Sequence, residues 1–339
     1  MAERPRRPTL RDIAQATGLS SATVSYALRG LHVPAATQDR VREAARDLGY
    51  QADPIARALA SGRSGYVGVL CGSQEDSWQQ TLATAIGRGL LEVELNALVV
   101  DAANDPALEA SLAQRLVDQR VDALVVLPVD PGGEHWATIG ARTVLISIGD
   151  GLPRAATAAE VVYDNAGGVT DALTRLAEAG HRRITVLTPV GTSTPDRPAE
   201  QVVRSVGAQL GLRIEIRTAP HDLDGAAAVA LTVLTGIDRP TAVFCLADSI
   251  AHGVYAAAQT LHLAVPEDIS VLGFDDRPVS RILTPPLSTY RWPVDELVAA
   301  VVDRTVRGID TGRRTRRKVV AASPQMRSSI ADVRVGSHR

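Results

Sequence analysis

The sequence predicts an α/β protein with a small all-helical head at its N-terminus and a two-lobed body of doubly wound parallel sheets. Residues 9–49 contain only short helical patterns. From Tyr66 onward, short apolar runs alternate with Ala-rich stretches of helical periodicity. This alternation is typical of parallel strands that are covered by helices on both faces.

The distribution of charged residues also changes between the helical head and the body, near residue 65. The first 65 residues hold ten arginines, no lysine and six carboxylates, whereas the whole chain has a net charge of −2. The remainder of the chain is therefore acidic. A basic segment joined to an acidic body favours contact between the head and a polyanion.

Three short helices are expected in the head. The first spans about 10–16, and Gly18 supplies the positive φ that a tight turn requires. The second begins at Ser20, a good N-cap, and the third begins after Thr37 and ends at Gly49. The apolar residues expected to form their common core are Leu10, Ile13, Ala14, Val24, Ala27, Leu28, Val41, Ala44, Ala45 and Leu48.

The spacing within residues 9–30 is typical of a helix-turn-helix. Two closely crossing helices need a small residue at the crossing, a glycine in the turn and a branched apolar residue in the second helix, and Ala14, Gly18 and Val24 meet these needs. The second helix then presents short polar groups and one aromatic ring outward: Ser20, Ser21, Ala22, Thr23, Ser25 and Tyr26. Such groups can approach base edges and phosphates in a major groove. A plain three-helix scaffold with capping serines is the alternative.

The body holds about 270 residues, which is large for one doubly wound unit, so we predict two lobes with a cleft between them. Ligands in such folds bind at the carboxyl ends of the strands. The apolar runs expected to form strands are YVGVLC, ALVVD, ALVVLP, TVLISIG, ITVLTP, TAVFCLA and SVLGFD.

Composition argues against several other classes of protein. Cys71 and Cys245 each lie inside an apolar run, so we expect two small buried side chains, with no disulfide and no metal site. The N-terminus has positive charge but no apolar segment behind it, and no run approaches the roughly 20 apolar residues of a membrane span. We therefore expect a cytoplasmic protein without membrane contact.

An enzyme on a doubly wound fold is one alternative. The chain has no GxGxxG after a strand, no P-loop and no catalytic or metal-ligand cluster at a mechanistic spacing. The scattered histidines are expected at the surface or at helix caps: His135, His181, His221, His252 and His262. We therefore expect no catalytic residue, no cofactor and no metal.

The chain resembles the lac/gal repressor family of bacterial transcription factors in TLRDIAQATGLSSATVSYALRG and TQDRVREAARDLGYQADPIARALASGRSGYVGVL. The resemblance continues through VVYDNAGGV, GHRRITVL and DSIAHGVYAA to VPEDISVLGFDD and TPPLSTYRWPVDEL, and so covers nearly all of the chain. It implies a periplasmic-binding-protein-like body. The implied division is a helix-turn-helix DNA-binding domain (1–50), a hinge helix and linker (51–65), an effector-binding and dimerisation domain (66–330) and a C-terminal tail (331–339).

The resemblance implies DNA-binding roles for the second helix. Thr23 and Ser25 correspond to phosphate or base contacts, and Ser21, Ala22 and Tyr26 correspond to residues that contact base edges. Tyr26 replaces an arginine that is often found there, so the operator sequence of other members cannot be transferred to this chain. The remaining DNA-binding candidates are Thr9, Ser20, Arg29, Ala56 and Leu59.

Leu59 matches the family's hinge leucine, which wedges into the minor groove at the operator centre and kinks the DNA. Contact between two hinge helices is the alternative role for this position. Asp53 stands where the family has asparagine, and a carboxylate near phosphates is unfavourable. The expected contribution of the hinge to DNA affinity is therefore modest.

The resemblance also implies an effector cleft between the lobes. Asp275 matches a carboxylate that accepts hydrogen bonds from the ligand, and Arg197 matches a ligand-binding arginine. Trp78 and Asp150 are further candidates, with stacking on a sugar ring and ordinary packing both open for Trp78. Ala247 replaces a bidentate asparagine of sugar-binding members, so the effector is expected to be a sugar held differently or another small metabolite.

The expected partners are a near-palindromic double-stranded DNA operator, a small sugar-like effector and a second copy of the chain. The end of the chain, VRVGSHR, is too short and polar to form a coiled coil, so a dimer is predicted. Repression is the default of the family. The alternative is a solute-binding protein with the same body, which would require a signal peptide and no DNA-binding head.

Overall fold

The computed structural model describes residues 8–50, 62–189 and 199–333 of the chain. The chain falls into two units, Met1–Ser64 and Gly65–Arg339, here termed the head and the body. The predicted hinge helix, with Ala56 and Leu59, lies outside the described residues.

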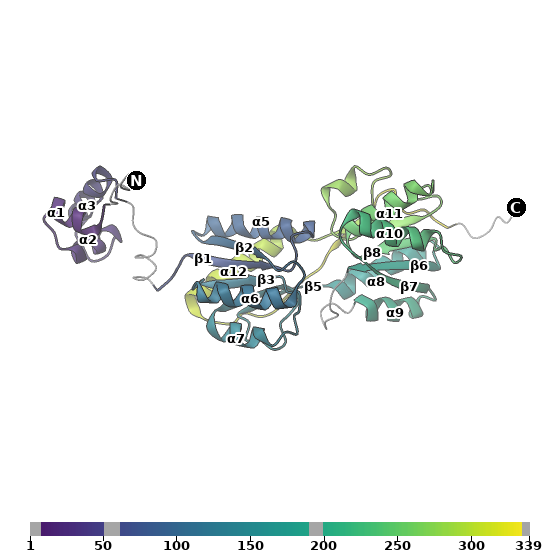
Figure 1. The fold of residues 1–339 in the computed structure, drawn as a ribbon, viewed down its shortest axis with the longest axis horizontal. Helices are drawn as coiled ribbons and strands as arrows, with labels where there is room; N and C mark the ends of the chain where they lie inside the picture. Colours follow the sequence, from purple (N-terminus) through teal and green to yellow (C-terminus); the bar gives the residue numbers. More distant parts are fainter. Residues whose placement is uncertain (1–7, 51–61, 190–198, 334–339) are drawn as a thin grey trace, which may run out of the picture. The chain divides into compact units, whose positions relative to one another are not determined.

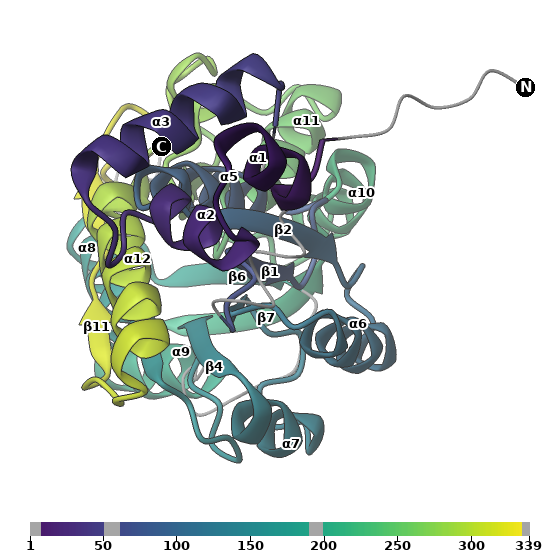
Figure 2. The same ribbon diagram turned by 90° about the vertical axis from the view of Figure 1, so that its left-hand side faces the viewer.

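Three helices form the head, as the sequence predicts: α1 (Leu10–Thr17), α2 (Ser21–Leu28) and α3 (Ala35–Asp47) (Figures 1 and 2). Gly18 ends α1 in the left-handed conformation with φ 67°, which allows the tight turn into α2. All three helices contribute to one apolar core, whose fully buried members are Ile13, Val24, Ala27, Val41 and Ala45.

The third helix differs from the prediction at both ends. It begins at Ala35, before Thr37, because Pro34 as the N-cap has an extended backbone that leads directly into the first turn. Leu48 follows the last helical residue as the C-cap and is 39% exposed, so it does not join the core.

The first lobe of the body is a six-stranded parallel sheet in the order β11-β5-β4-β3-β1-β2. Helices α5 and α12 pack together on one face, and α6 and α7 pack together on the other (Figure 2). The elements are β1 (Tyr66–Cys71), α5 (Ser77–Glu92), β2 (Asn96–Asp101), α6 (Pro106–Asp118), β3 (Ala123–Val126), α7 (His135–Arg142), β4 (Val144–Gly149), β5 (Ala159–Tyr163), α12 (Val294–Thr311) and β11 (Lys318–Val320).

The second lobe is a four-stranded parallel sheet in the order β7-β6-β8-β9, with α8 and α9 on one face and α10 and α11 on the other. A two-stranded antiparallel ribbon of β10 and β12 completes it. The elements are α8 (Asn165–Glu178), β6 (Arg183–Pro189), α9 (Ala199–Gln209), β7 (Arg213–Ala219), α10 (Leu223–Leu234), β8 (Ala242–Cys245), α11 (Asp248–Thr260), β9 (Ser270–Leu272), a 3₁₀ turn (Pro278–Arg281), β10 (Thr289–Arg291) and β12 (Ser323–Gln325).

The chain passes between the lobes three times: after β5, after β10 and after β11. One continuous apolar cluster includes buried residues of both lobes, such as Val69 of β1 and Val186 of β6, and it includes Trp292, which lies on the second crossing. The crossings therefore bring the two sheets together at one apolar cluster that both lobes share. The sequence predicts a cleft at this position.

Each predicted strand run corresponds to a strand, but the prediction missed three strands of the two sheets. β7 lies at a sheet edge and alternates charged and apolar residues, with most of its residues partly or fully exposed. β5 and β11 are short and begin with residues that are not continuously apolar. Cys71 and Cys245 are free and fully buried, as predicted. Among the described helices, none is long and apolar enough to cross a membrane.

Candidate ligand pocket and nucleic-acid interface

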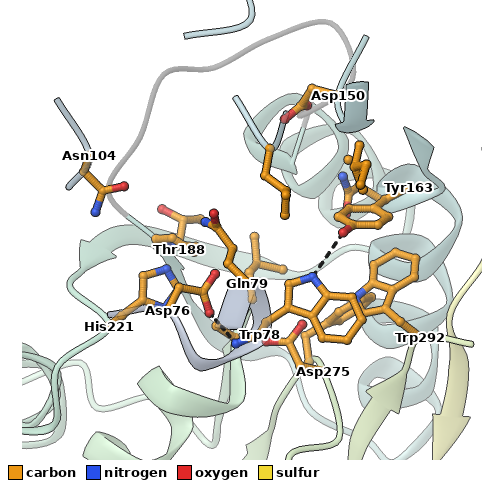
Figure 3. Close-up of a pocket in the computed structure, with 18 of the residues that line it drawn as sticks. Asp76, Trp78, Gln79, Asn104, Asp150, Tyr163, Thr188, His221, Asp275 and Trp292 are labelled. Atoms are coloured by element: carbon orange, nitrogen blue, oxygen red, sulfur yellow. Dashed lines mark hydrogen bonds between the residues drawn. The ribbon is translucent and has the colours of Figure 1, made fainter. Parts of the chain in front are cut away.

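A cavity of roughly 300 Å³ opens at the carboxyl ends of the strands of both lobes (Figure 3). The first lobe contributes residues that follow β1, β2, β3 and β4, and the second contributes residues that follow β6, β7, β8 and β9. Its polar and aromatic lining comprises Asp76, Trp78, Gln79, Asn104, Asp150, Tyr163, Asn165, Thr188, Glu200, Thr218, His221, Phe274, Asp275 and Trp292. The sequence-based expectation of a cleft at the strand ends is confirmed.

Aromatic rings form one wall of this cavity. Trp78, from the first turn of α5, donates its indole N–H to the hydroxyl of Tyr163 over 3.1 Å. The Tyr163 ring lies 4.5 Å from Trp292, which is only 3% exposed. Tyr163 and Trp292 lie on the first and second of the three crossings, and Trp78 lies on α5, so the wall brings together residues of two crossings and of this helix. Each of the three rings lies within 6.5 Å of the other two, centre to centre.

Asp275 lies against this wall, in the turn after β9, and has the unusual φ of 115°. Its backbone N–H donates to the carbonyl of Tyr290 over 2.8 Å, and the nearby Trp292 side chain favours the ionised form of its carboxyl. Burial raises the pKa of Asp275 well above its usual range, and the nearby carboxylates of Asp248 and Asp76 add to this rise. A carboxyl that is held neutral can both donate and accept hydrogen bonds.

Asp248 stabilises the turn that carries Asp275. Its side chain is fully buried, and accepts hydrogen bonds from the hydroxyls of Ser280 (2.6 Å) and Thr289 (2.5 Å) and from the backbone N–H of Arg277 (2.8 Å). Burial raises the pKa of Asp248 to about 6, although the three hydrogen bonds oppose this rise. A Cβ on Gly273 would lie 2.3 Å from Asp248 Oδ1, so this position requires glycine.

Asp276 fixes the other side of the turn. It is 6% exposed and accepts hydrogen bonds from Arg281 over 3.1 Å, from Arg291 over 2.6 Å and from Arg327. These arginines hold the pKa of Asp276 below its usual range, against the opposing effect of burial. The backbone that carries Asp275 is therefore tied to its surroundings on both sides.

Three of the four predicted effector residues line the same cavity: Trp78, Asp150 and Asp275. Trp78 is 7% exposed, so it is packed in the aromatic wall as well as facing the cavity. Asp150 follows β4 directly and is 1% exposed. Arg197 lies outside the described residues.

Several lining residues were not expected from the sequence. His221 was expected at the surface or at a cap, but it lines the cavity, where its Nδ1 lies 2.9 Å from Ser249 Oγ. His181 was wrongly placed too: it is 1% exposed, with Nδ1 2.9 Å from Thr241 Oγ1. The available signal was position. His221 and Asn104 follow the carboxyl ends of β7 and β2, and Thr188 lies next to the last residue of β6.

The head presents one exposed polar face on α2. Ser20 caps this helix by accepting from Thr23 N over 3.1 Å, and its hydroxyl lies 2.8 Å from Thr23 Oγ1. Ser21, Ala22 and Tyr26 are exposed, whereas Thr23 and Ser25 are half-buried. The exposed surface of the second helix thus has the composition that the sequence predicts.

Arg29 lies beside Tyr26 at the end of this face. Its guanidinium carbon is 5.3 Å from the centre of the Tyr26 ring, and its Nε donates to the carbonyl of Ser25 over 3.3 Å. Thr9, at the other end of the helix pair, caps α1: its N–H and its hydroxyl both donate to Asp12 Oδ2 over 2.7 Å. Arg29 is therefore the positively charged residue closest along the chain to the exposed residues of α2. Thr9 acts as a helix cap in the isolated head.

A helix-turn-helix head and a body with a two-lobed cleft define a DNA-binding protein that responds to a ligand. The chain matches the profile of bacterial regulatory proteins of the lacI family over residues 9–53 and that of the periplasmic binding protein-like domain over residues 173–330. It is 33% identical to the HTH-type transcriptional regulator MalR of Streptomyces coelicolor over 306 residues, covering 86% of this chain and 88% of MalR. The chain belongs to the lacI family of bacterial regulatory proteins.

Other relatives agree with this assignment. The ribose operon repressor of Escherichia coli is 28% identical over 307 residues, covering 87% of this chain and 91% of the repressor. The crystal structure of the lac repressor dimer bound to operator and the anti-inducer ONPF has a TM-score of 0.84 at 21% identity, covering 96% of this chain and all of that one. The folds of the head and of the body are therefore similar to those of the lac repressor.

Proposed function

We propose that this protein is a transcriptional repressor that binds a near-palindromic operator as a homodimer and changes its affinity when a small sugar-like effector enters the body. The observation that carries this proposal is the presence, in one chain of the lacI family, of an exposed α2 face and a cavity lined by both lobes. Full-length similarity to MalR and to the ribose operon repressor supports regulation of transcription.

In this proposal the head contacts the operator. Ser21, Ala22 and Tyr26 contact base edges, because they are the exposed members of the α2 face. Thr23 and Ser25 contact phosphates or bases. Ser20, Arg29 and Thr9 add contacts at the helix ends, and Ala56 and Leu59 of the hinge segment (51–65) enter the minor groove. Residues 1–50 thus form the DNA-binding domain.

The body (66–330) holds the effector and the dimer contact, and residues 331–339 are a tail. Asp275, Trp78 and Asp150 bind the effector together with Arg197. Support comes from the shared cavity, from the fixed turn of Asp275 and from the neutral state that its environment favours. Closure of the lobes around a ligand would favour the closed state of the body. The ligand can then control DNA binding, because it binds one state of the body more tightly than the other.

The protein acts by binding and carries out no catalysis, because its relatives are regulators and its cavity residues fit ligand binding. It works in the cytoplasm, since a regulator must reach the chromosome. A solute-binding protein of the same body fold would have no use for the α2 face.

Selection of operator sequences tests the proposal directly. Full-length protein is incubated with a pool of random 24-base-pair duplexes, and bound DNA is sequenced over several rounds. We expect a two-fold symmetric consensus, protection of both half-sites and two chains per duplex, because a symmetric dimer requires symmetric half-sites. Enrichment of no sequence, or of a single asymmetric half-site with one chain bound, would refute the proposal.

A further inference from the structure

The loop between α12 and β11 carries the densest run of positive charge in the body. Its residues, 312–318, read GRRTRRK and hold four arginines, the single lysine of the chain and no carboxylate. We term it the basic loop. The body from residue 66 onward holds 26 arginines and lysines against 32 carboxylates, so the basic loop stands out in an otherwise acidic body. Such a concentration of one sign favours contact with a polyanion.

Ion pairs within the body neutralise only part of this charge. Arg317 lies 3.6 Å from Glu160, and Lys318 lies 2.8 Å from Glu296. The other three arginines of the loop are exposed and form no ion pair with any residue that the structure describes: Arg313, Arg314 and Arg316. Asp310, in the last turn of α12, is the carboxylate nearest to them along the chain. Even if Asp310 offsets one of the three, at least two positive charges remain for a partner.

The backbone of the basic loop is held in place. Gly312 ends α12 in the left-handed conformation, with φ 63°, and its N–H donates to the carbonyl of Gly308 over 2.9 Å. In the middle of the loop, the backbone N–H of Thr315 donates to the carbonyl of Ala158 over 2.8 Å. From Lys318 onward the chain pairs with β5. The exposed arginines are therefore carried by a fixed backbone.

The basic loop lies at the edge of the first lobe where the chain enters the body. All six strands of this sheet are parallel, so their amino ends share one edge, and the loop leads into the amino end of β11. Gly65 precedes β1 at the same edge, where its carbonyl accepts from Asn96 N and its N–H donates to Asp122, each over 2.8 Å. Four strand spacings separate β11 from β1, which places the loop roughly 19 Å along the sheet from this entry point.

We propose that the basic loop binds the phosphate backbone of double-stranded DNA that flanks the half-sites held by the heads. Residues 51–64 connect the head to the entry point and span at most about 50 Å when fully extended, which equals about 15 base pairs of duplex. The DNA beside a half-site is therefore a polyanion within reach of this edge. The inference rests on the proposed operator binding by the head and adds a second DNA contact, on the body.

This contact should add affinity without sequence preference, because arginines that meet only phosphates do not distinguish bases. Each phosphate that is neutralised steepens the dependence of log affinity on log salt by roughly 0.9. Two or three arginines of one loop should therefore add about 2 to 3 units of slope. Between about 50 and 200 mM salt, such a slope corresponds to a ten- to forty-fold loss of the added affinity.

Two duplexes that share one operator test the inference. The first has the selected operator at its minimal length, and the second adds about 18 base pairs of random sequence on one side, so that one loop of a dimer can engage the flank. Dissociation constants for the full-length protein are measured across this range of salt. We expect the flanked duplex to bind more tightly, with a slope steeper by about 2 to 3 units, whatever the sequence of the flank.

A loop variant shows whether the exposed arginines cause this gain. It combines Arg313→Gln, Arg314→Gln and Arg316→Gln, three exchanges at exposed positions that should leave thermal unfolding unchanged. The variant should bind the minimal operator within about two-fold of the native protein. It should lose most of the added affinity and of the added salt slope on the flanked duplex.

A matched control makes the same change in net charge on the second lobe. It combines Arg204→Gln, Arg213→Gln and Arg217→Gln, which are also exposed. The control should keep the native gain from the flank. Equal gains in the native protein and the loop variant would overturn the inference and leave the basic loop to solvent or to an acidic protein. Equal losses in the loop variant and the control would also overturn it, because net charge alone would then account for the effect.

The same measurements separate this inference from the proposed function. If the native protein binds no operator, the proposed function fails, and the inference fails with it. If it binds a symmetric operator but gains nothing from the flank, only the DNA contact of the body fails.

Discussion

Replacement of Trp292 by phenylalanine tests how the cavity holds its ligand. The Trp292 side chain lies near Asp275 in the cavity lining and favours the ionised form of its carboxyl, and the only donor of an indole is its N–H. Phenylalanine keeps an aromatic ring near Tyr163, at 4.5 Å in the native protein, and near Phe274, at 5.5 Å. The substitution therefore removes the indole N–H from beside Asp275 while most of the aromatic wall remains.

The size of the effect follows from burial. Trp292 is 3% exposed, so water does not easily take the place of the indole N–H, and the loss of a buried polar partner costs about 1 to 3 kcal/mol. If Asp275 binds the effector, its misplacement should weaken effector binding by roughly 5- to 150-fold, since each 1.4 kcal/mol is ten-fold. Operator affinity without effector should stay within about two-fold, because Trp292 lies in the body.

Trp136 supplies the matched control. It is fully buried in the first lobe, and its indole N–H donates to the carbonyl of Asp130 over 2.8 Å, but it does not line the cavity. Trp136→Phe should lose comparable thermal stability and keep effector affinity. Effector affinity is measured by calorimetry for both variants and for the native protein. Equal losses of effector affinity in Trp292→Phe and Trp136→Phe would contradict this prediction, because the weaker binding would then follow from general loss of stability.

Further predictions concern the turn, the head and the hinge. Asp275→Asn should bind operator normally but require a higher effector concentration for the same response, in a titration of operator affinity; identical midpoints would remove Asp275 from the site. Burial raises the pKa of Asp248 from 3.8 to about 6, so its contribution to folding is fully present below pH 3.8 and is lost as the pH rises to 6. The free energy of unfolding of the native protein should therefore fall by about 3 kcal/mol between pH 4 and pH 7, and that of Asp248→Asn should not show this fall in thermal unfolding experiments. Tyr26→Ala should change the preferred bases in operator selection, whereas Arg29→Ala should weaken all operators alike and reduce the salt dependence by about one unit of slope. Leu59→Ala should lower operator affinity about ten-fold or more and reduce DNA bending in a circular-permutation assay.

Local patterns predicted most of the fold because they act over short distances. The apolar run YVGVLC is typical of a strand in a parallel sheet that is covered on both faces, and all six of its residues form β1. Gly18 and Ser20 define a turn and a cap, which depend only on neighbouring residues. β7 was missed because an edge strand is half exposed and needs no continuous apolar run, so only its neighbour β6 reveals it.

The candidate site was predictable only where a resemblance or a strand end pointed to a residue. Asp275 was found through its motif, but the rise in its pKa depends first on burial and then on the carboxylates of Asp248 and Asp76, which are distant in sequence. Trp292 was not found, because nothing local distinguishes an indole on a crossing from an ordinary packed one. His221 was misplaced for the same reason. The contacts that make these residues functional form only when the two lobes come together.

The central claim is that a ligand in the body controls operator binding by the head. The most direct test measures the dissociation constant of the full-length protein for its selected operator, with and without a saturating sugar that calorimetry shows to bind the body, at one fixed salt concentration. The account predicts a change of at least five-fold, within the range of roughly 5- to 150-fold typical of allosteric coupling, and loss of that change in Trp292→Phe at the same ligand concentration. An operator affinity that is unchanged when calorimetry shows the body to be saturated would contradict it.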